Sequence, residues 1–379
     1  MLAFLGILLW QLTTSETKKV ASGTPDLLAF VTGATILKES PRDLYNLQQQ
    51  QLVQEKLRGL KPGVMGGVLS FRNPPIVAAL FLPYTYLNVF QQYRVQIIVN
   101  FILQVIIFWL LTKKPWGNKE AVFWIVNIVA FLPILANYGF GQISFLLVLI
   151  YIAIYKSLKN DNSFQAGIFT GLLFIKIQYL IIIPWLLLLA TKKLRFLTGL
   201  VVSLALMVII NSALYGTDFL PFYLKFLITS ESSSFGTDIL QNYSIPSIMV
   251  ALHIHEIGAK VILVGSLFVI ALVQIYKKRL TISKEALFSG ITVLGLTLNI
   301  HTMAPDLTLL LIPITFLYYQ ETLKNGVALL ILFYFLPWLG LLKLQWIATI
   351  GLTAIGFYFL SSTSFKIPNL ANETSGKTN

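Results

Sequence analysis

The stretch QQYRVQIIVNFILQVIIFWLLT, residues Gln91 to Thr112, decides the fold class. It is an apolar run that ends at a pair of lysines, Lys113-Lys114. A helix needs about 20 consecutive, mainly apolar residues to cross the hydrocarbon core of a bilayer. Apolar runs recur along nearly the whole chain and leave no room for a soluble domain of about 100 residues or more. The sequence therefore predicts an all-α integral membrane protein.

Composition and charge agree with this class. Of the residues 56% are hydrophobic and only 11% are charged, whereas soluble domains carry about 25% charged residues. The chain has no cysteine, which excludes disulfides, thiolate metal sites and a cysteine nucleophile. The net charge of +13 lies largely in clusters at alternate connections between apolar runs: Lys113-Lys114, Lys156 with Lys159, Lys192-Lys193 with Arg195, Lys277-Lys278-Arg279, and Lys324. Such clusters are typical of cytoplasmic loops, so we expect no nucleic acid as a partner.

About twelve membrane segments are expected, with the N-terminus inside. The expected segments are Met1–Leu12, Gln91–Thr112, Ala121–Ala136, Gln142–Tyr155, Phe164–Ile175, Gln178–Ala190, Phe196–Tyr215, Ala259–Tyr276, Glu285–Ile300, Leu307–Tyr319, Gly326–Leu341 and Leu344–Leu360. No basic n-region precedes the first run, so we expect no cleaved signal peptide. The chain then divides into a first segment with an outward loop (1–90), a helical bundle with a second outward loop near 216–258 (91–361), and a polar tail (362–379), which we expect to be disordered.

Both outward loops contain amphipathic segments. Asp26–Leu37 and Leu47–Leu57 in the first loop and Asp218–Ile228 in the second have apolar residues at helical spacing. This pattern predicts helices that lie along the membrane surface. Ile76–Leu82, which follows Pro74-Pro75, is too short to span and is expected to dip into the interface.

Asp26 is the first candidate for catalysis. It lies in the first outward loop, and a carboxylate beside hydrocarbon is costly enough that it usually has a function. A second interpretation is equally open: Asp is a favoured N-cap residue and Pro25 marks a turn, so Asp26 caps the helix that follows.

Lys176 is the second candidate. It lies at the turn between Phe164–Ile175 and Gln178–Ala190, and about 12 helical residues rise only about 18 Å. Lys176 is therefore expected within the membrane thickness, where an ammonium group faces a cavity or a partner. The alternative is that the long side chain reaches the membrane surface.

The order of several motifs resembles that of the GT-C membrane glycosyltransferases, and within them glycosyltransferase family 87. The motifs are Asp26 with Phe30, Gly33-Ala34 and Leu44-Tyr45-Asn46; Phe71-Arg72-Asn73-Pro74-Pro75; Gly141-Gln142; Ala166-Gly167, Gly171 and Lys176; Asn242-Tyr243-Ser244; and, more weakly, His301-Thr302-Met303-Ala304-Pro305-Asp306. Ala29 and Asn73 depart from the family, which often has aromatic residues there. These two departures concern the identity of the substrate more than the reaction class.

The resemblance implies a GT-C-type helical bundle and a transferase that uses a polyprenyl-phosphate sugar. Because the leaving phosphate is a stable anion, one carboxylate on the acceptor hydroxyl and a basic clamp suffice. Asp26 is the expected base. Lys176, His301 and Arg94 are the expected clamp, with Arg72 in reserve.

Two members of this clamp have alternatives. Arg94 begins an apolar helix and is also a plausible interfacial anchor. His301 is also a plausible structural partner of Asp306. Tyr45, Gln142 and Asn242 are expected to bind substrate.

No metal or other cofactor is expected. His253, His255 and Glu256 do not share one helical face, and no P-loop, GxGxxG or DxD string occurs.

The function expected from the sequence is inverting transfer of a hexose, with mannose the expected sugar. The donor is a polyprenyl phosphate, the acceptor is a lipid or glycan, and the site lies on the outer face of a plasma membrane. The main alternative is a lipid or small-solute transporter, for which we see no repeat between the two halves. A purely structural assembly partner leaves Asp26 and Lys176 unexplained.

Overall fold

The computed structural model describes residues 25–64, 67–112, 117–191, 193–232, 242–254, 256–320 and 326–362. All regular structure in these ranges is helical. The expected first segment Met1–Leu12, the polar tail and most of the second outward loop's polar stretch lie outside the described residues.

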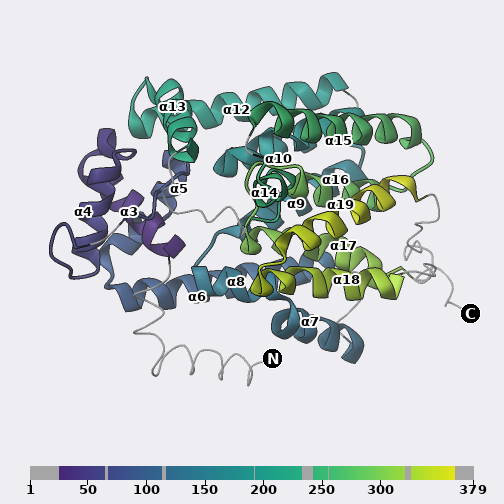
Figure 1. Cartoon of the computed structure of the whole chain (residues 1–379), viewed down its shortest axis with the longest axis horizontal. Helices are drawn as coiled ribbons and strands as arrows, with labels where there is room; N and C mark the ends of the chain where they lie inside the picture. The colour runs from purple at the N-terminus through teal and green to yellow at the C-terminus, as the bar shows by residue number, and fades with distance from the viewer. Residues whose placement is uncertain are drawn as a thin grey trace, which may run out of the picture.

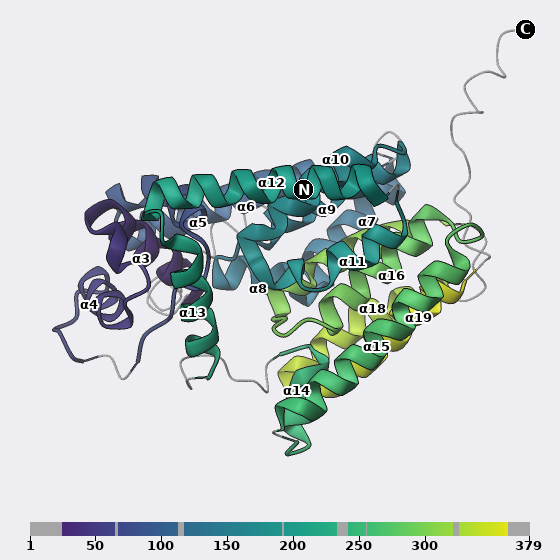
Figure 2. The same ribbon diagram turned by 90° about the horizontal axis from the view of Figure 1, so that it is seen from above.

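The helices that begin the described chain form a group at one end of the molecule, at the left of Figures 1 and 2. They are α3 (Pro25–Glu39), η1 (Pro41–Asp43), α4 (Leu47–Leu57), α5 (Pro75–Leu80) and η2 (Leu82–Tyr86). α3 packs against the other four. The expected helices in the first loop are confirmed, and α4 has the predicted bounds. Asn46 begins α4 by accepting hydrogen bonds from the backbone N–H groups of Gln48 and Gln49.

The rest of the chain forms the bundle shown in Figure 1. Its elements are α6 (Val89–Leu111), α7 (Asn118–Ala130), α8 (Leu132–Phe140), α9 (Ser144–Lys159), α10 (Ser163–Gly171), η3 (Leu172–Leu180), α11 (Ile183–Leu189), α12 (Lys193–Tyr215), α13 (Phe219–Ser232), α14 (Ile245–Ala251), α15 (Ile257–Lys278), α16 (Lys284–Thr297), η5 (Ala304–Leu310), α17 (Leu311–Tyr318), α18 (Gly326–Trp338), η6 (Leu339–Leu342) and α19 (Gln345–Ser361).

Three described helices are long and apolar enough to cross a membrane: α6, α12 and α15. A fourth span results if α7 and α8, bent by 57° at their junction, are taken together. Several shorter apolar helices accompany them, so the number of about twelve segments is not confirmed. The expected span Ala121–Ala136 is broken at Phe131, because Pro133 lacks an N–H group and cannot continue the helix from α7.

α10 and α12 pack unusually closely. A Cβ atom added at Gly167 would lie 2.1 Å from the carbonyl oxygen of Phe196, and one at Gly199 would lie 2.1 Å from that of Phe164. Only glycine fits at both positions, as is common where membrane helices touch backbone to backbone. This contact fixes α10, and therefore η3 that follows it, against the long helix α12.

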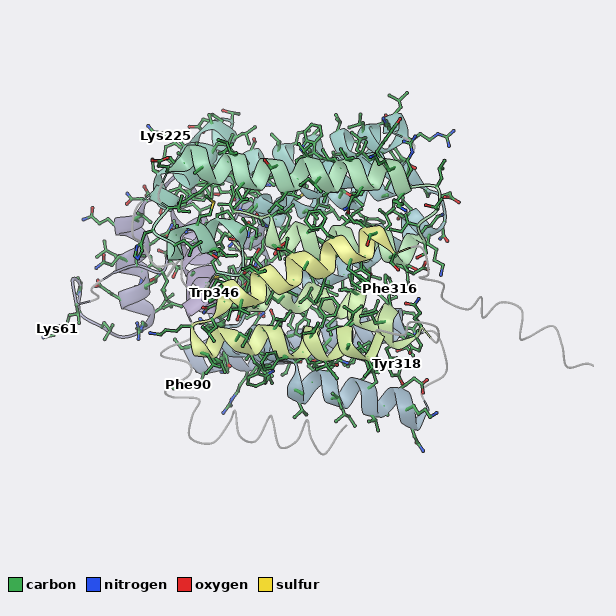
Figure 3. All side chains as sticks on the ribbon, turned by 45° about the vertical axis from the view of Figure 1, so that its right-hand side comes forward. Lys61, Phe90, Lys225, Phe316, Tyr318 and Trp346 are labelled. Atoms are coloured by element: carbon green, nitrogen blue, oxygen red, sulfur yellow. The ribbon has the colours of Figure 1, made fainter. Side chains whose placement is uncertain are left out.

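The two loops that the sequence predicts to face outward contact each other. The ring of Tyr45 packs at a tilt against those of Tyr215, Tyr223 and Phe226, with centroids 4.9 to 5.5 Å apart, and Arg42 forms an ion pair with Asp218. The first helical group is thereby attached to α12 and α13. Figure 3 shows Lys61 and Lys225 at the same end of the molecule, and Phe316 and Tyr318 toward the other end.

Candidate functional site

Asp26 lies in the first turn of α3, and the turn between α8 and α9 lies directly against it. Gly141 ends α8 in the left-handed conformation, with φ of 65°. A Cβ atom at this position would be 2.7 Å from the Cβ of Leu27, the neighbour of Asp26. The positive φ and the close approach both require glycine here. The motif Gly141-Gln142 therefore brings Gln142 to Asp26.

The carboxyl of Asp26 has an elevated pKa. Asp26 keeps partial solvent exposure, but burial of its carboxyl raises the pKa from 3.8 to about 6. A hydrogen bond from the Gln142 side chain and the positive charge of Lys176 lower the pKa, and the charge of Asp306 raises it again. Desolvation is the largest of these effects. A carboxyl with a pKa near 6 is ionised at neutral pH and is still basic enough to accept a proton.

Lys176 is held inside the protein by Asp306. Its backbone leaves the helical conformation, with φ of −133° and ψ of 82°, so η3 is kinked at this residue. The ammonium Nζ lies 2.5 Å from Oδ1 of Asp306, and the two side chains are 8% and 2% exposed. Lys176 faces a partner, as one of the two sequence interpretations predicts, and does not reach the surface.

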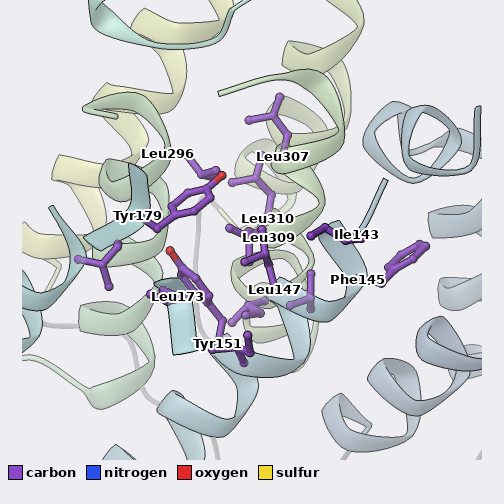
Figure 4. Close-up of a cluster of buried hydrophobic side chains, with 14 of the residues drawn as sticks. Ile143, Phe145, Leu147, Tyr151, Leu173, Tyr179, Leu296, Leu307, Leu309 and Leu310 are labelled. Atoms are coloured by element: carbon purple, nitrogen blue, oxygen red, sulfur yellow. The ribbon is translucent and has the colours of Figure 1, made fainter. Parts of the chain in front are cut away.

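Asp306 is itself fixed by its surroundings. Its Oδ2 accepts a hydrogen bond from the backbone N–H of Met303 at 3.0 Å, and the hydroxyl of Ser144 lies 3.5 Å from Oδ1. Tyr151 and Tyr179, whose rings meet edge to face at 6.3 Å, belong to a cluster of buried side chains (Figure 4), and the charge of Asp306 acts on both.

Asn242 holds the segment that leads to Asp306. Its side-chain Oδ1 accepts a hydrogen bond from the N–H of Thr302 at 2.7 Å, and its Nδ2 donates to the carbonyl of Ile300 at 3.2 Å. The N–H of Tyr243 donates to the carbonyl of Thr302 at 2.7 Å. His301 lies within this clamped segment and is partly exposed.

The remaining predicted residues lie elsewhere. Arg94 is exposed on α6. Tyr45 is buried in the aromatic cluster between the loops, and its hydroxyl donates to the carbonyl of Asn73 at 3.1 Å. Arg72 is partly exposed, and its carbonyl accepts a hydrogen bond from Tyr223 at 2.9 Å. The structure thus brings Asp26, Gln142 and Lys176 together, and Asn242 supports them indirectly.

Sequence reasoning missed the role of Asp306 as the partner of Lys176. It considered Asp306 only beside His301. The signal was present, because a lysine within the membrane thickness requires a counter-ion and few acidic residues are available. No group of three or more His, Cys, Asp or Glu side chains arranged to hold a metal ion occurs among the described residues.

This geometry supports acid–base chemistry on a ligand that approaches Asp26. A partly exposed carboxylate with a raised pKa is suited to accept a proton from a hydroxyl. The nearby ammonium stabilises negative charge that develops close to it. The centre combines residues of α3, of the turn between α8 and α9, of η3 and of η5 in a chain whose apolar helices define it as a membrane protein.

The family of the chain follows from comparison with known proteins. The model of glycosyltransferase family 87 matches residues 71–305, more than half of the chain, and the protein belongs to this family. The matched region contains Gln142, Lys176 and Asn242, whereas Asp26 precedes it and Asp306 directly follows it. No curated protein and no solved structure matches the chain. The chain is therefore a glycosyltransferase, not the transporter of the alternative interpretation.

Proposed function

We propose that the protein is an inverting hexosyltransferase that uses a polyprenyl-phosphate sugar, with mannose as the sugar. The observation that carries the proposal is the carboxyl of Asp26, which has a pKa of about 6 and lies beside Gln142 within reach of the charge of Lys176. The acceptor is a lipid or glycan, and the membrane supplies the donor. The arrangement is of the GT-C type, and the active site faces away from the cytoplasm of a plasma membrane.

The reaction is a single displacement. The acceptor hydroxyl oxygen forms a bond to C1 of the sugar while the bond from C1 to the phosphate oxygen breaks, and the hydroxyl proton passes to Asp26. The electron pair of the broken bond stays on the phosphate, which leaves as polyprenyl phosphate. Because this anion is stable without protonation, no general acid is required. One displacement inverts the configuration at C1.

The donor phosphate needs positive charge. Lys176 is the first group we assign to it, with His301 and Arg94 as further candidates. The ammonium of Lys176 is already oriented by Asp306 at 2.5 Å, so binding requires little further ordering of its long side chain. Gln142 is assigned to substrate binding. Tyr45, which is buried in the aromatic cluster, and Asn242, which holds the backbone of Ile300 and Thr302, contribute to substrate binding indirectly. We expect the reaction to need no metal ion.

The test is transfer of radiolabelled mannose from polyprenyl-phosphate mannose to extracted cell lipids by the purified protein. Asp26→Asn keeps the size of the side chain and cannot accept the proton, so turnover should fall at least about a hundredfold. Asp161→Asn is a matched control, because Asp161 pairs with Lys284 at 2.7 Å on the exposed surface. Transfer by Asp26→Asn at the rate of this control would contradict the proposed base. Failure of the wild type with mannose, but success with another polyprenyl-phosphate hexose, would correct only the sugar.

A further inference from the structure

The buried ammonium of Lys176 lies close enough to the proposed base, Asp26, to change the pKa of its carboxyl. Asp26 and Lys176 carry opposite charges, and the charge of Lys176 acts on Asp26. Lysine has a long flexible stem, and a poorly hydrated carboxylate is a strong partner for its ammonium. A direct ion pair between them would stabilise the ionised form of Asp26 and weaken it as a base. A third group is therefore needed to keep the ammonium of Lys176 from pairing directly with Asp26.

Asp306 is placed to do this. Its Oδ1 lies 2.5 Å from Nζ of Lys176, and its other oxygen is anchored by the N–H of Met303. The helix kink at Lys176 points the side chain to η5, which packs on α8 and α9, the elements that flank Gln142. The position of Asp306 is in turn supported by Asn242, whose side chain binds the backbone of Ile300 and Thr302.

We propose that Asp306 is a positioning residue for the transfer reaction: it anchors the ammonium of Lys176 so that this group faces the donor phosphate without pairing directly with Asp26. The proposal rests on the proposed function. It assigns Asp306 no contact with substrate. Burial has the largest effect on the pKa of Asp26, and the charge of Asp306 and the fixed ammonium adjust how readily Asp26 gives up and accepts a proton.

The proposal predicts opposite effects of the two partners on Asp26. The negative charge of Asp306 raises the pKa of Asp26, and the positive charge of Lys176 lowers it. Asp306→Asn removes the first effect and frees Lys176 to approach, so the pKa of Asp26 should fall. Lys176→Met removes the second effect and should raise it. In Lys176→Met with Asp306→Asn, both charges are absent and the value should return toward that of the wild type.

Other charged groups near α3 stay constant in these variants. The elements packed against α3 carry Arg42 and Asp43 in η1, Glu55 and Lys56 in α4, and the tyrosines of η2 and α8. α3 itself also carries Lys38 and Glu39. None of these is changed, so differences among the variants report on Lys176 and Asp306.

The experiment measures protonation of Asp26 without any substrate. A hydrophobic carbodiimide reacts with protonated carboxyl groups, and mass spectrometry of peptides separates Asp26 from Asp306. The purified full-length protein is labelled over a range of pH, and the midpoint of labelling at Asp26 is compared among wild type, the two single variants, the double variant and the Asp161→Asn control. Turnover with polyprenyl-phosphate mannose is measured in parallel.

The expected result is a midpoint near pH 6 for the wild type, a lower one for Asp306→Asn, and a higher one for Lys176→Met. The acid limb of turnover against pH should move with the labelling midpoint, which a purely structural role would not cause. An unchanged midpoint in Asp306→Asn would overturn the proposal. If Asp306→Asn does not fold, Lys176→Met is compared with the double variant. Adding Asp306→Asn to Lys176→Met must lower the labelling midpoint of Asp26. An identical midpoint in these two variants overturns the proposal. The labelling midpoints test the role of Asp306 and do not depend on turnover. The proposed function is tested separately, because transfer that survives Asp26→Asn would contradict it.

Discussion

Breaking the Lys176–Asp306 pair from one side should destabilise the protein far more than removing both charges. The two side chains are 8% and 2% exposed, and their charged atoms are 2.5 Å apart. Truncating one partner of such a pair leaves an uncompensated buried charge and costs about 3–5 kcal/mol. Lys176→Met keeps most of the apolar stem, so nearly all of this cost comes from the unpaired carboxylate of Asp306.

Adding Asp306→Asn to Lys176→Met removes that carboxylate. Asn keeps an oxygen that can accept the hydrogen bond from the N–H of Met303, which Asp306 binds at 3.0 Å. The double variant should therefore recover at least about 2 kcal/mol relative to Lys176→Met, a coupling typical of residues in direct contact.

The free energy of unfolding can be measured by titration with sodium dodecyl sulfate in mixed micelles, followed by circular dichroism. Asp161→Asn serves as the control, because it breaks the Lys284 pair of similar length on the surface. That change should cost no more than about 1 kcal/mol. Additive costs of Lys176→Met and Asp306→Asn would refute the reasoning, because they would mean that the two charges do not stabilise each other in the folded protein.

Further predictions concern Asp26 and its surroundings. Because the base must be ionised and its pKa is about 6, turnover should be half-maximal near pH 6 and fall tenfold per unit below it; a rate that does not change between pH 5 and 7 would argue against Asp26 as the base. The folded pKa of Asp26 lies above the value of 3.8 in the unfolded chain, so its contribution to stability is fully present below pH 3.8 and is lost as pH rises through 6. The stability gained in Asp26→Asn should consequently be larger at pH 8 than at pH 4 by about 2–3 kcal/mol, and chemical denaturation at the two pH values checks the sign. Gly141→Ala forces a left-handed alanine against Leu27; it should cost about 1–3 kcal/mol and lower turnover, whereas wild-type stability and turnover would show that the turn is free to adjust. Finally, Lys56→Cys on α4 should react with an impermeant thiol reagent in intact cells, and Arg279→Cys after α15 should react only after permeabilisation, because both positions are exposed; the reverse pattern would invert the proposed orientation.

Local signals in the sequence predicted the helices of the first loop well. α4 begins and ends at the predicted residues because its start is set by the Asn46 cap and its apolar face by spacing within the segment itself. The helix that carries Asp26 was expected over 26–37 and occupies Pro25–Glu39. Such helices are determined by residues close to one another in the sequence, so local patterns are sufficient to predict them.

Contacts between distant residues were predicted only in part. Lys176 was expected to face a cavity or partner, but that partner is 130 positions away, and hydrophobic spacing does not specify which helices meet. The break at Phe131 was missed because an apolar run containing Pro133 still has the composition of one span. Counting apolar runs therefore identified a membrane protein without giving its number of spans.

The pairing of Arg42 with Asp218 has a consequence for biosynthesis. The two residues are 176 positions apart, so Arg42 leaves the ribosome long before its partner is made. Until α13 has emerged, η1 and the neighbouring Tyr45 lack the aromatic side chains that hold them in the finished protein. The helix α3, which carries Asp26, does not depend on this contact, because it packs on α4, α5, η1, η2 and α8. The contact between the two loops therefore forms only after α12 and α13 have been synthesised.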